Sequence, residues 1–312
     1  MYKTICISVL AAIALTSCDG RPKSRATQVP IAATHGMQQF EPVMHERTGD
    51  AAGCFWEGFR FDDPSYVAAQ DTAAMLRHFA HYAMLVAQTG DPSPMAELMR
   101  RAEASDEAFR YFMFLGEAVL HDPNSPLRND ELYIPVLETI VETDIISDIE
   151  KTAPRFDLDM AMKNRTGHPA NDFLMKSVDG RRMRLYDIAS EWTLLFFSNP
   201  ECPMCHSIQQ QLETSRIVTG AVAAGRLKVV MVYPDDDLQA WSGYAQHVPG
   251  EWIYARNADG AIRDMMIYDL KAIPSMYLLD AGKHVILKDI SETSAIEYAL
   301  AGLGGDEYKQ SL

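Results

Sequence analysis

The stretch that most constrains this chain runs from Trp192 to His206, with the sequence WTLLFFSNPECPMCH. Its first part, up to Phe197, is mostly apolar and aromatic, which predicts a buried β-strand. Ser198-Asn199-Pro200 predicts a turn, and apolar residues at helical spacing follow the second of two cysteines. A strand, a turn, Cys-x-x-Cys and a helix in this order are typical of a redox site.

The two cysteines take different places in the predicted helix. Cys202 is expected at the N-cap, with Pro203 at the first helical position, where a missing N–H costs nothing. The unpaired N–H groups and the helix dipole favour a thiolate on Cys202, which makes it the candidate nucleophile. Cys205 follows Met204 one turn into the helix, close enough to attack a mixed disulfide on Cys202. It is the candidate resolving thiol.

This segment and its surroundings resemble the thioredoxin superfamily, and within it the membrane-tethered TlpA/ResA-like thiol-disulfide oxidoreductases. The similar segments are Gly167–Phe173 for the first strand, Val178–Arg181 for its hairpin turn, and Ala272–Lys283 for the part that carries a cis-proline. The resemblance implies an α/β thioredoxin-like C-terminal domain, in which a central mixed sheet is flanked by helices. It also implies that Pro274 is the cis-proline beside the two sulfurs and that Ile273 shapes the rim of the site.

Three residues depart from the pattern of these relatives. Glu201 stands where many relatives have Trp, and its carboxylate disfavours a neighbouring thiolate. Phe196 stands where thioredoxin carries a buried acid, so proton transfer must use another group or water. His206 would favour the thiolate in its protonated form. These opposing influences predict a moderate thiolate, which favours a reducing or isomerising role over strong oxidation.

The N-terminus predicts export. Lys3 gives a positive start, and Ile5–Leu15 is an apolar run too short to span a bilayer as a mature helix. Leu15-Thr16-Ser17-Cys18 resembles a bacterial lipobox, which implies cleavage before Cys18 and lipidation of its sulfur. An ordinary secretory signal with an incidental cysteine is the alternative. We expect a lipid-anchored protein of the bacterial cell envelope that faces the periplasm.

The chain has 312 residues and 47% hydrophobic content, which suits two domains with real cores. Aromatic and Met stripes at helical spacing predict an all-α domain before the thioredoxin-like one, and its role is not indicated by the sequence. The expected order is signal peptide 1–17, tether 18–44, helical domain 45–155, linker 156–166, thioredoxin-like domain 167–304 and tail 305–312. In the C-terminal part, strands are expected at about 172–176, 182–185, 192–198, 227–233, 275–279 and 284–289, and helices near 203–219, 236–246, 261–269 and 292–303.

The formal net charge of -15 argues against nucleic acid as a partner, because phosphate contacts need clustered Lys and Arg. The expected partners are exported proteins with disulfides or thiols, and a membrane thiol-relay protein as the electron source of a reductase. We expect no metal or organic cofactor, since the Cys202–Cys205 disulfide is itself the redox group. Cys54 is left over, either as a buried small hydrophobe or as a resolving or partner-bridging thiol.

Two alternatives come from other functional classes. Cys202 to His206 also matches Cys-x-x-Cys-His, the c-type haem attachment pattern. The preceding hydrophobic strand and the Ile273-Pro274 segment, which haem attachment does not require, weigh against it. The second alternative is a binding or structural lipoprotein that acts through its helical domain, because a fold does not guarantee an activity.

Overall fold

The computed structural model describes residues 38–42 and 51–304. Those from Gln38 onward belong to one compact unit. The predicted signal peptide 1–17, the lipidation site Cys18, most of the tether and the tail 305–312 lie outside the described residues. Among the helices that the structure does describe, none is both long and apolar enough to cross a membrane.

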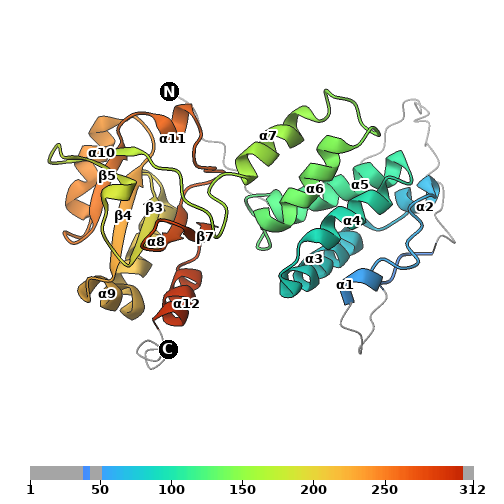
Figure 1. The fold of residues 1–312 in the computed structure, drawn as a ribbon, viewed down its shortest axis with the longest axis horizontal. Coiled ribbons are helices and arrows are strands. Elements are labelled where there is room, and N and C mark those ends of the chain that lie inside the picture. Colours follow the sequence, from blue (N-terminus) through green and yellow to red (C-terminus); the bar gives the residue numbers. More distant parts are fainter. Residues whose placement is uncertain (1–37, 43–50, 305–312) are drawn as a thin grey trace, which may run out of the picture. The chain divides into compact units, whose positions relative to one another are not determined.

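The first half of the described chain is helical (Figure 1). Its helices are α1 (Ala51–Cys54), α2 (Pro64–Ala68), α3 (Thr72–Thr89), α4 (Ser93–Ala102), α5 (Asp106–Gly116), the π-helical turn η1 (Glu117–His121), α6 (Asp130–Glu142) and α7 (Thr152–Ala161). Side-chain hydrogen bonds cap the N-termini of several of these helices. Ser105 accepts a hydrogen bond from the Ala108 N–H at 3.2 Å before α5, and Asn129 accepts one from the Leu132 N–H at 3.2 Å before α6. The predicted all-α domain is therefore confirmed.

Aromatic side chains fill the core of this helical half. Trp56 packs edge-on against Phe112, with ring centroids 5.0 Å apart. Phe40 stacks on Trp56 at 5.1 Å and is 5% exposed. Residues 38–42 lie in the segment 18–44, which was expected to be a flexible tether. That expectation is wrong for these five residues. Burial of the apolar Phe40 ring is favourable and holds them against the helical half.

Helix α7 occupies Thr152–Ala161, so most of the segment 156–166 that was expected to be a connector is helical or directly follows a helix. Met160 and Ala161 of α7 are buried. The apolar residues of this helix are few, which is why its periodicity is weak in the sequence. The exact boundary between the two halves stays a prediction.

The second half holds one mixed sheet with the strand order β2-β1-β5-β4-β3-β6-β7. The strands are β1 (Leu174–Ser177), β2 (Arg182–Arg184), β3 (Trp192–Phe197), β4 (Leu227–Tyr233), β5 (Ile253–Asn257), β6 (Ser275–Leu279) and β7 (Val285–Ile290). β3, β4 and β5 are parallel neighbours, and β6 runs antiparallel to β3. The predicted central mixed sheet is confirmed.

Helices cover the sheet (Figure 1). They are α8 (Pro203–Thr214), α9 (Arg216–Ala223), α10 (Leu238–Tyr244), α11 (Ala261–Asp264) and α12 (Thr293–Leu303), with 3-10 turns η2 (Leu185–Asp187) and η3 (Ala245–His247). Alternate residues of β3 enter two different cores. Leu194 and Phe196 pack with residues of α8, α9 and α12, whereas Leu195 and Phe197 pack with the opposite cluster around Phe173.

The structure differs from the sequence-based elements at three places. β5 was not predicted, because its sequence IYARN has little of the β-branched character of β4. The helix expected over 203–219 is divided at Ser215, whose side chain accepts the Val218 N–H at 3.2 Å and starts α9. The helix expected over 261–269 ends at Asp264.

Candidate active site

Cys202 lies at the start of α8, where the chain leaves the turn that follows β3. Its backbone is extended, with φ -92° and ψ 110°, and its Sγ accepts the Cys205 N–H at 3.2 Å. This is an N-cap contact made by sulfur, and it holds Cys202 against the free N–H groups of the first helical turn. The sequence-based placement of Cys202 at the N-cap and Pro203 at the first helical position is confirmed.

Asn199 organises the turn before Cys202. Its carbonyl accepts the Cys202 N–H at 3.0 Å, and its Oδ1 accepts the Glu201 N–H at 2.9 Å. Its Nδ2 donates to Asp235 Oδ2 at 2.9 Å. Asp235 follows β4, the parallel neighbour of β3, so the contact ties together the carboxyl ends of two adjacent strands. The turn that presents Cys202 is thereby fixed from both sides.

Cys205 lies behind Cys202 in the interior. Its side chain is buried, whereas Cys202 is only partly covered, and both are thiols. Burial, followed by the contact with Cys202, raises the pKa of the Cys205 thiol to about 12. The Asn199 backbone and the Ser198 hydroxyl act in the opposite direction and favour its thiolate. The two sulfurs therefore differ in access and in the stability of their charged forms.

Ser198 is a site residue that the sequence reasoning missed. It is 2% exposed, and its hydroxyl has no hydrogen-bond partner within residues 38–42 and 51–304. Phe196, at the position of the buried acid in thioredoxin, is fully buried and apolar. Ser198 is thus a buried polar group that lowers the pKa of the Cys205 thiol, and its place at the end of an apolar strand was the available signal.

Ile273 and Pro274 face Cys202 from the loop before β6. The peptide bond between them is cis, as the resemblance implies. The Cys202 thiol donates to the Ile273 carbonyl oxygen at 3.6 Å between sulfur and oxygen. The structure therefore brings Cys202, Cys205, Ile273 and Pro274 together.

The remaining candidate residues surround the sulfurs. Glu201 is exposed, and Met204 is 59% exposed between the two cysteines. His206 Nε2 donates to the Pro200 carbonyl oxygen at 2.8 Å, and its ring stacks on Tyr244 with centroids 5.2 Å apart. A c-type haem needs this imidazole as an iron ligand and both sulfurs on one open face. The bonded His206 and the buried Cys205 do not favour that alternative.

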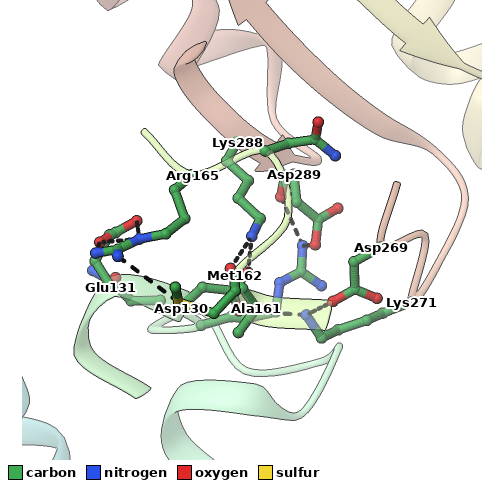
Figure 2. Close-up of polar contacts among 12 residues, drawn as sticks. Asp130, Glu131, Ala161, Met162, Arg165, Asp269, Lys271, Lys288 and Asp289 are labelled. Carbon is green, nitrogen blue, oxygen red and sulfur yellow. Dashed lines mark hydrogen bonds and ion pairs between the residues drawn. The ribbon is translucent and has the colours of Figure 1, made fainter. Parts of the chain in front are cut away.

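A cluster of buried charged side chains connects the loop before Ile273 to the helical half, and Figure 2 shows it. Asp130, the first residue of α6, lies 2.7 Å from Lys288 Nζ and 3.4 Å from Lys271 Nζ. Lys271 also bonds Asp269. Burial alone would raise the pKa of Asp130, but the ammonium groups of Lys288 and Lys271 outweigh it and lower that pKa. The pairing is what makes these buried charges tolerable.

A second connection reaches the other side of Pro274. Arg128 of the helical half donates to the Asp289 carbonyl oxygen at 2.8 Å and lies 3.0 Å from Asp289 Oδ2. Ser275, which directly follows Pro274, donates to Asp289 Oδ1 at 2.7 Å. The helical half therefore contacts Lys271, which precedes the Ile273-Pro274 bond, and Asp289, which bonds Ser275 after it. These long-range partners were not predicted.

No grouping of three or more His, Cys, Asp or Glu side chains within residues 38–42 and 51–304 is arranged to hold a metal ion. The chemistry that the site offers is that of its two thiols. Cys202 is reachable and lies at a helix N-terminus, and Cys205 is one turn away. This is the arrangement needed for reversible formation of a disulfide between them.

The chain is similar to one protein family and to several solved structures. Residues 45–164 match a family described as a domain of unknown function, DUF5106. The crystal structure of a thioredoxin-like protein from Bacteroides caccae is 32% identical, with a TM-score of 0.75, and the match covers 80% of this chain and 90% of that one. None of the curated proteins matches the sequence.

Two further solved structures match less than half of this chain. The C-terminal domain of an uncharacterized protein from Bacteroides fragilis is 37% identical, with a TM-score of 0.43, over 44% of this chain and 98% of that one. A domain of a possible thiol-disulfide isomerase from Cytophaga hutchinsonii is 22% identical, with a TM-score of 0.38, over 48% of this chain and 97% of that one. No activity follows from these two matches for this chain.

Proposed function

The chain belongs to the thioredoxin-like protein family, and we propose that it is a thiol-disulfide oxidoreductase whose redox group is the Cys202–Cys205 pair. One observation carries the proposal. The Cys202 sulfur lies at the N-terminus of α8 between the Cys205 N–H and the Ile273 carbonyl, with the Cys205 thiol buried behind it. An accessible attacking sulfur and a protected resolving sulfur are the two parts that disulfide exchange requires.

In the reducing direction, the Cys202 thiolate attacks one sulfur of a client disulfide. A bond forms between Cys202 and that sulfur, and the other client sulfur leaves as a thiolate and takes up a proton. Cys205 then loses its proton and attacks the Cys202 sulfur, which releases the second client thiol. Two electrons have passed from the dithiol to the client, and Cys202 and Cys205 are left as a disulfide.

Deprotonation of Cys205 is the least favourable step of this reaction, because burial raises the pKa of its thiol to about 12. Once Cys202 is in a mixed disulfide, its sulfur no longer competes as a second negative charge beside Cys205. The Ser198 hydroxyl favours the Cys205 thiolate at this stage. Ser198 therefore acts as a positioning residue, because it touches neither client sulfur.

We place the protein in the bacterial cell envelope, lipid-anchored through Cys18, where it acts on exported proteins with thiols or disulfides. The support is the apolar N-terminal run and the lipobox-like Leu15–Cys18. The proposed direction is reduction or isomerisation, with a membrane thiol-relay protein as the electron source and no further cofactor. Mass spectrometry of the membrane-associated protein tests the anchor, since a lipid on Cys18 is lost in a Cys18→Ser variant.

Trapping tests the proposed chemistry. Cys205→Ser should accumulate a mixed disulfide with a small disulfide such as hydroxyethyl disulfide, since nothing resolves it. With Cys54 changed to Ala in both variants, Cys202→Ser should form none, because Cys205 is buried. Both variants should lose turnover with dithiothreitol as reductant. Full turnover in the Cys202→Ser variant would refute the assignment of the nucleophile.

A further inference from the structure

A cavity of about 430 Å³ lies beside the Ile273-Pro274 loop and is lined by both halves of the described chain. The helical half contributes Phe156 and Met160 of α7, and the other half contributes Ile262, Met266 and Ile273. The volume is within the range of pockets that bind ligands. The size and the apolar lining suit one large side chain of a bound polypeptide.

Two independent contacts connect residues that line the cavity to Cys202, which carries the reactive sulfur. Ile273, one of its lining residues, has its carbonyl oxygen 3.6 Å from Cys202 Sγ. Asp235, another lining residue, holds Asn199, whose carbonyl accepts the Cys202 N–H. A residue bound in the cavity is therefore close to a client cysteine that reacts with Cys202.

Part of the apolar lining is in contact with solvent. The Phe156 side chain is 49% exposed and Met266 is 42% exposed. Burial of these surfaces by an apolar side chain is favourable, and the same burial is not available for a small disulfide reagent. This distinguishes a polypeptide client from a small thiol compound.

The charges around the cavity favour a client segment that carries a basic residue over one that carries an acidic residue. Arg263 is already bonded to Asp236 and Asp264, and Lys271 is bonded to Asp130 and Asp269. Asp157 and Asp235 also line the cavity. Asp157 lies 3.7 Å from the imidazole of His121, and Asp235 accepts a hydrogen bond from the neutral Asn199 amide.

We propose that α7 of the helical half forms one wall of a client-binding pocket, which takes an apolar side chain of an extended client segment that has a basic residue near its reactive cysteine. The inference rests on the proposed function and adds the class of substrate to it. It also assigns a role to the helical half, as the part that selects polypeptide clients for the neighbouring Cys202.

Peptide kinetics test the pocket. Each peptide carries one cysteine as a mixed disulfide with glutathione, flanked by Leu and Lys, by Ser and Lys, or by Leu and Glu. The reduced full-length protein should react roughly tenfold faster with the Leu-Lys peptide than with the Ser-Lys peptide, the factor expected for burial of part of one apolar side chain. It should also prefer Leu-Lys to Leu-Glu, about threefold at low salt.

Two variants locate the effect. Phe156→Ala should reduce the rate with the Leu-Lys peptide about fivefold and leave the rate with hydroxyethyl disulfide within twofold of that of the unaltered protein. Asp157→Asn should remove most of the preference for Lys over Glu. Phe114→Ala is the matched control, because Phe114 is 45% exposed in α5 and lines a different cavity. It should change none of these rates.

The outcomes separate this inference from the proposed function. A normal reaction with hydroxyethyl disulfide, together with peptide rates that do not depend on Phe156, would overturn the pocket and leave the oxidoreductase function in place. Lack of reaction with every disulfide would overturn both. An equal loss in the Phe156→Ala and Phe114→Ala variants would also overturn the pocket, because it would show a general effect of the helical half.

Discussion

Cys202 and Cys205 are three residues apart in sequence and differ in what surrounds each sulfur. Cys202 Sγ faces a backbone N–H and a carbonyl at the rim of the site, whereas Cys205 is buried. In disulfide exchange, one sulfur must be accessible to attack the client disulfide, and the other must be protected until it resolves the mixed disulfide. The difference in burial therefore makes Cys202 the nucleophile and Cys205 the resolving thiol. It is a property of the folded helix terminus that no single residue type would supply.

Alkylation of the reduced protein should show this asymmetry. In a Cys54→Ala background at pH 7.5, iodoacetamide should modify Cys202 on the order of a hundredfold faster than Cys205, because burial protects Cys205 and raises its pKa to about 12. Peptide mass mapping over time measures both rates. Comparable rates at the two cysteines would contradict the assignment of nucleophile and resolving thiol.

Ser198 should affect only the second half of the exchange. Its hydroxyl lowers the pKa of Cys205, so Ser198→Ala should slow release of the client from the mixed disulfide by about three- to tenfold. The initial attack by Cys202 should be unchanged. Rapid-quench kinetics separate the two steps, and Ser207→Ala, an exposed serine of α8, serves as the control. A slower first step would show that Ser198 acts on Cys202 instead.

At the scale of elements, the local segment from β3 to α8 could be predicted because its signals are adjacent in sequence. The N-cap position of Cys202 follows from Pro203 and the helical pattern after it. The contact between Asn199 and Asp235 could not be predicted in this way, because it depends on β3 and β4 lying side by side. β5 was missed because its place between β4 and β1, rather than its own composition, makes it a strand.

The charged cluster around Asp130 should be important for stability. Asp130→Leu would leave Lys271 and Lys288 buried without their shared carboxylate, so it should lower the free energy of unfolding by about 3–5 kcal/mol. Urea denaturation measures the change. Glu97→Ala removes an exposed ion pair with Arg100 in the same half and should cost less than about 1 kcal/mol. Equal effects would show that the buried cluster adds nothing.

The contribution of Asp289 to the free energy of unfolding should depend on pH. Burial, only partly offset by Arg128 and Ser275, raises its pKa to about 6. The folded state then binds a proton more tightly than the unfolded chain, so this carboxyl group's contribution to stability falls as pH rises from about 4 to 6. Asp289→Asn should remove this change in the free energy of unfolding, which is of the order of 2–3 kcal/mol between about pH 4 and 6. Urea denaturation series at several pH values test it, and parallel curves for both proteins would contradict it.

For the whole molecule, the sequence predicted an all-α part followed by a mixed α/β sheet, because helical and strand periodicities are local. It did not predict how the two parts act on one another. Arg128 and Asp289, which join them near Pro274, are separated by 161 positions in sequence. Such a pair is set by tertiary packing alone, and so is the cavity between α7 and Ile273. Nothing in the segment 156–166, which was expected to be a connector, predicted that α7 would line this cavity.

The reduction potential of the Cys202–Cys205 couple decides whether the protein exchanges disulfides and in which direction. It is measured by equilibrating the protein, with Cys54 changed to Ala, against glutathione buffers and quantifying the dithiol fraction. We expect a reversible two-electron couple at or below roughly -250 mV, in the range of thioredoxin. A couple near roughly -120 to -180 mV would contradict the reducing direction, and the absence of any reversible couple would contradict disulfide exchange itself.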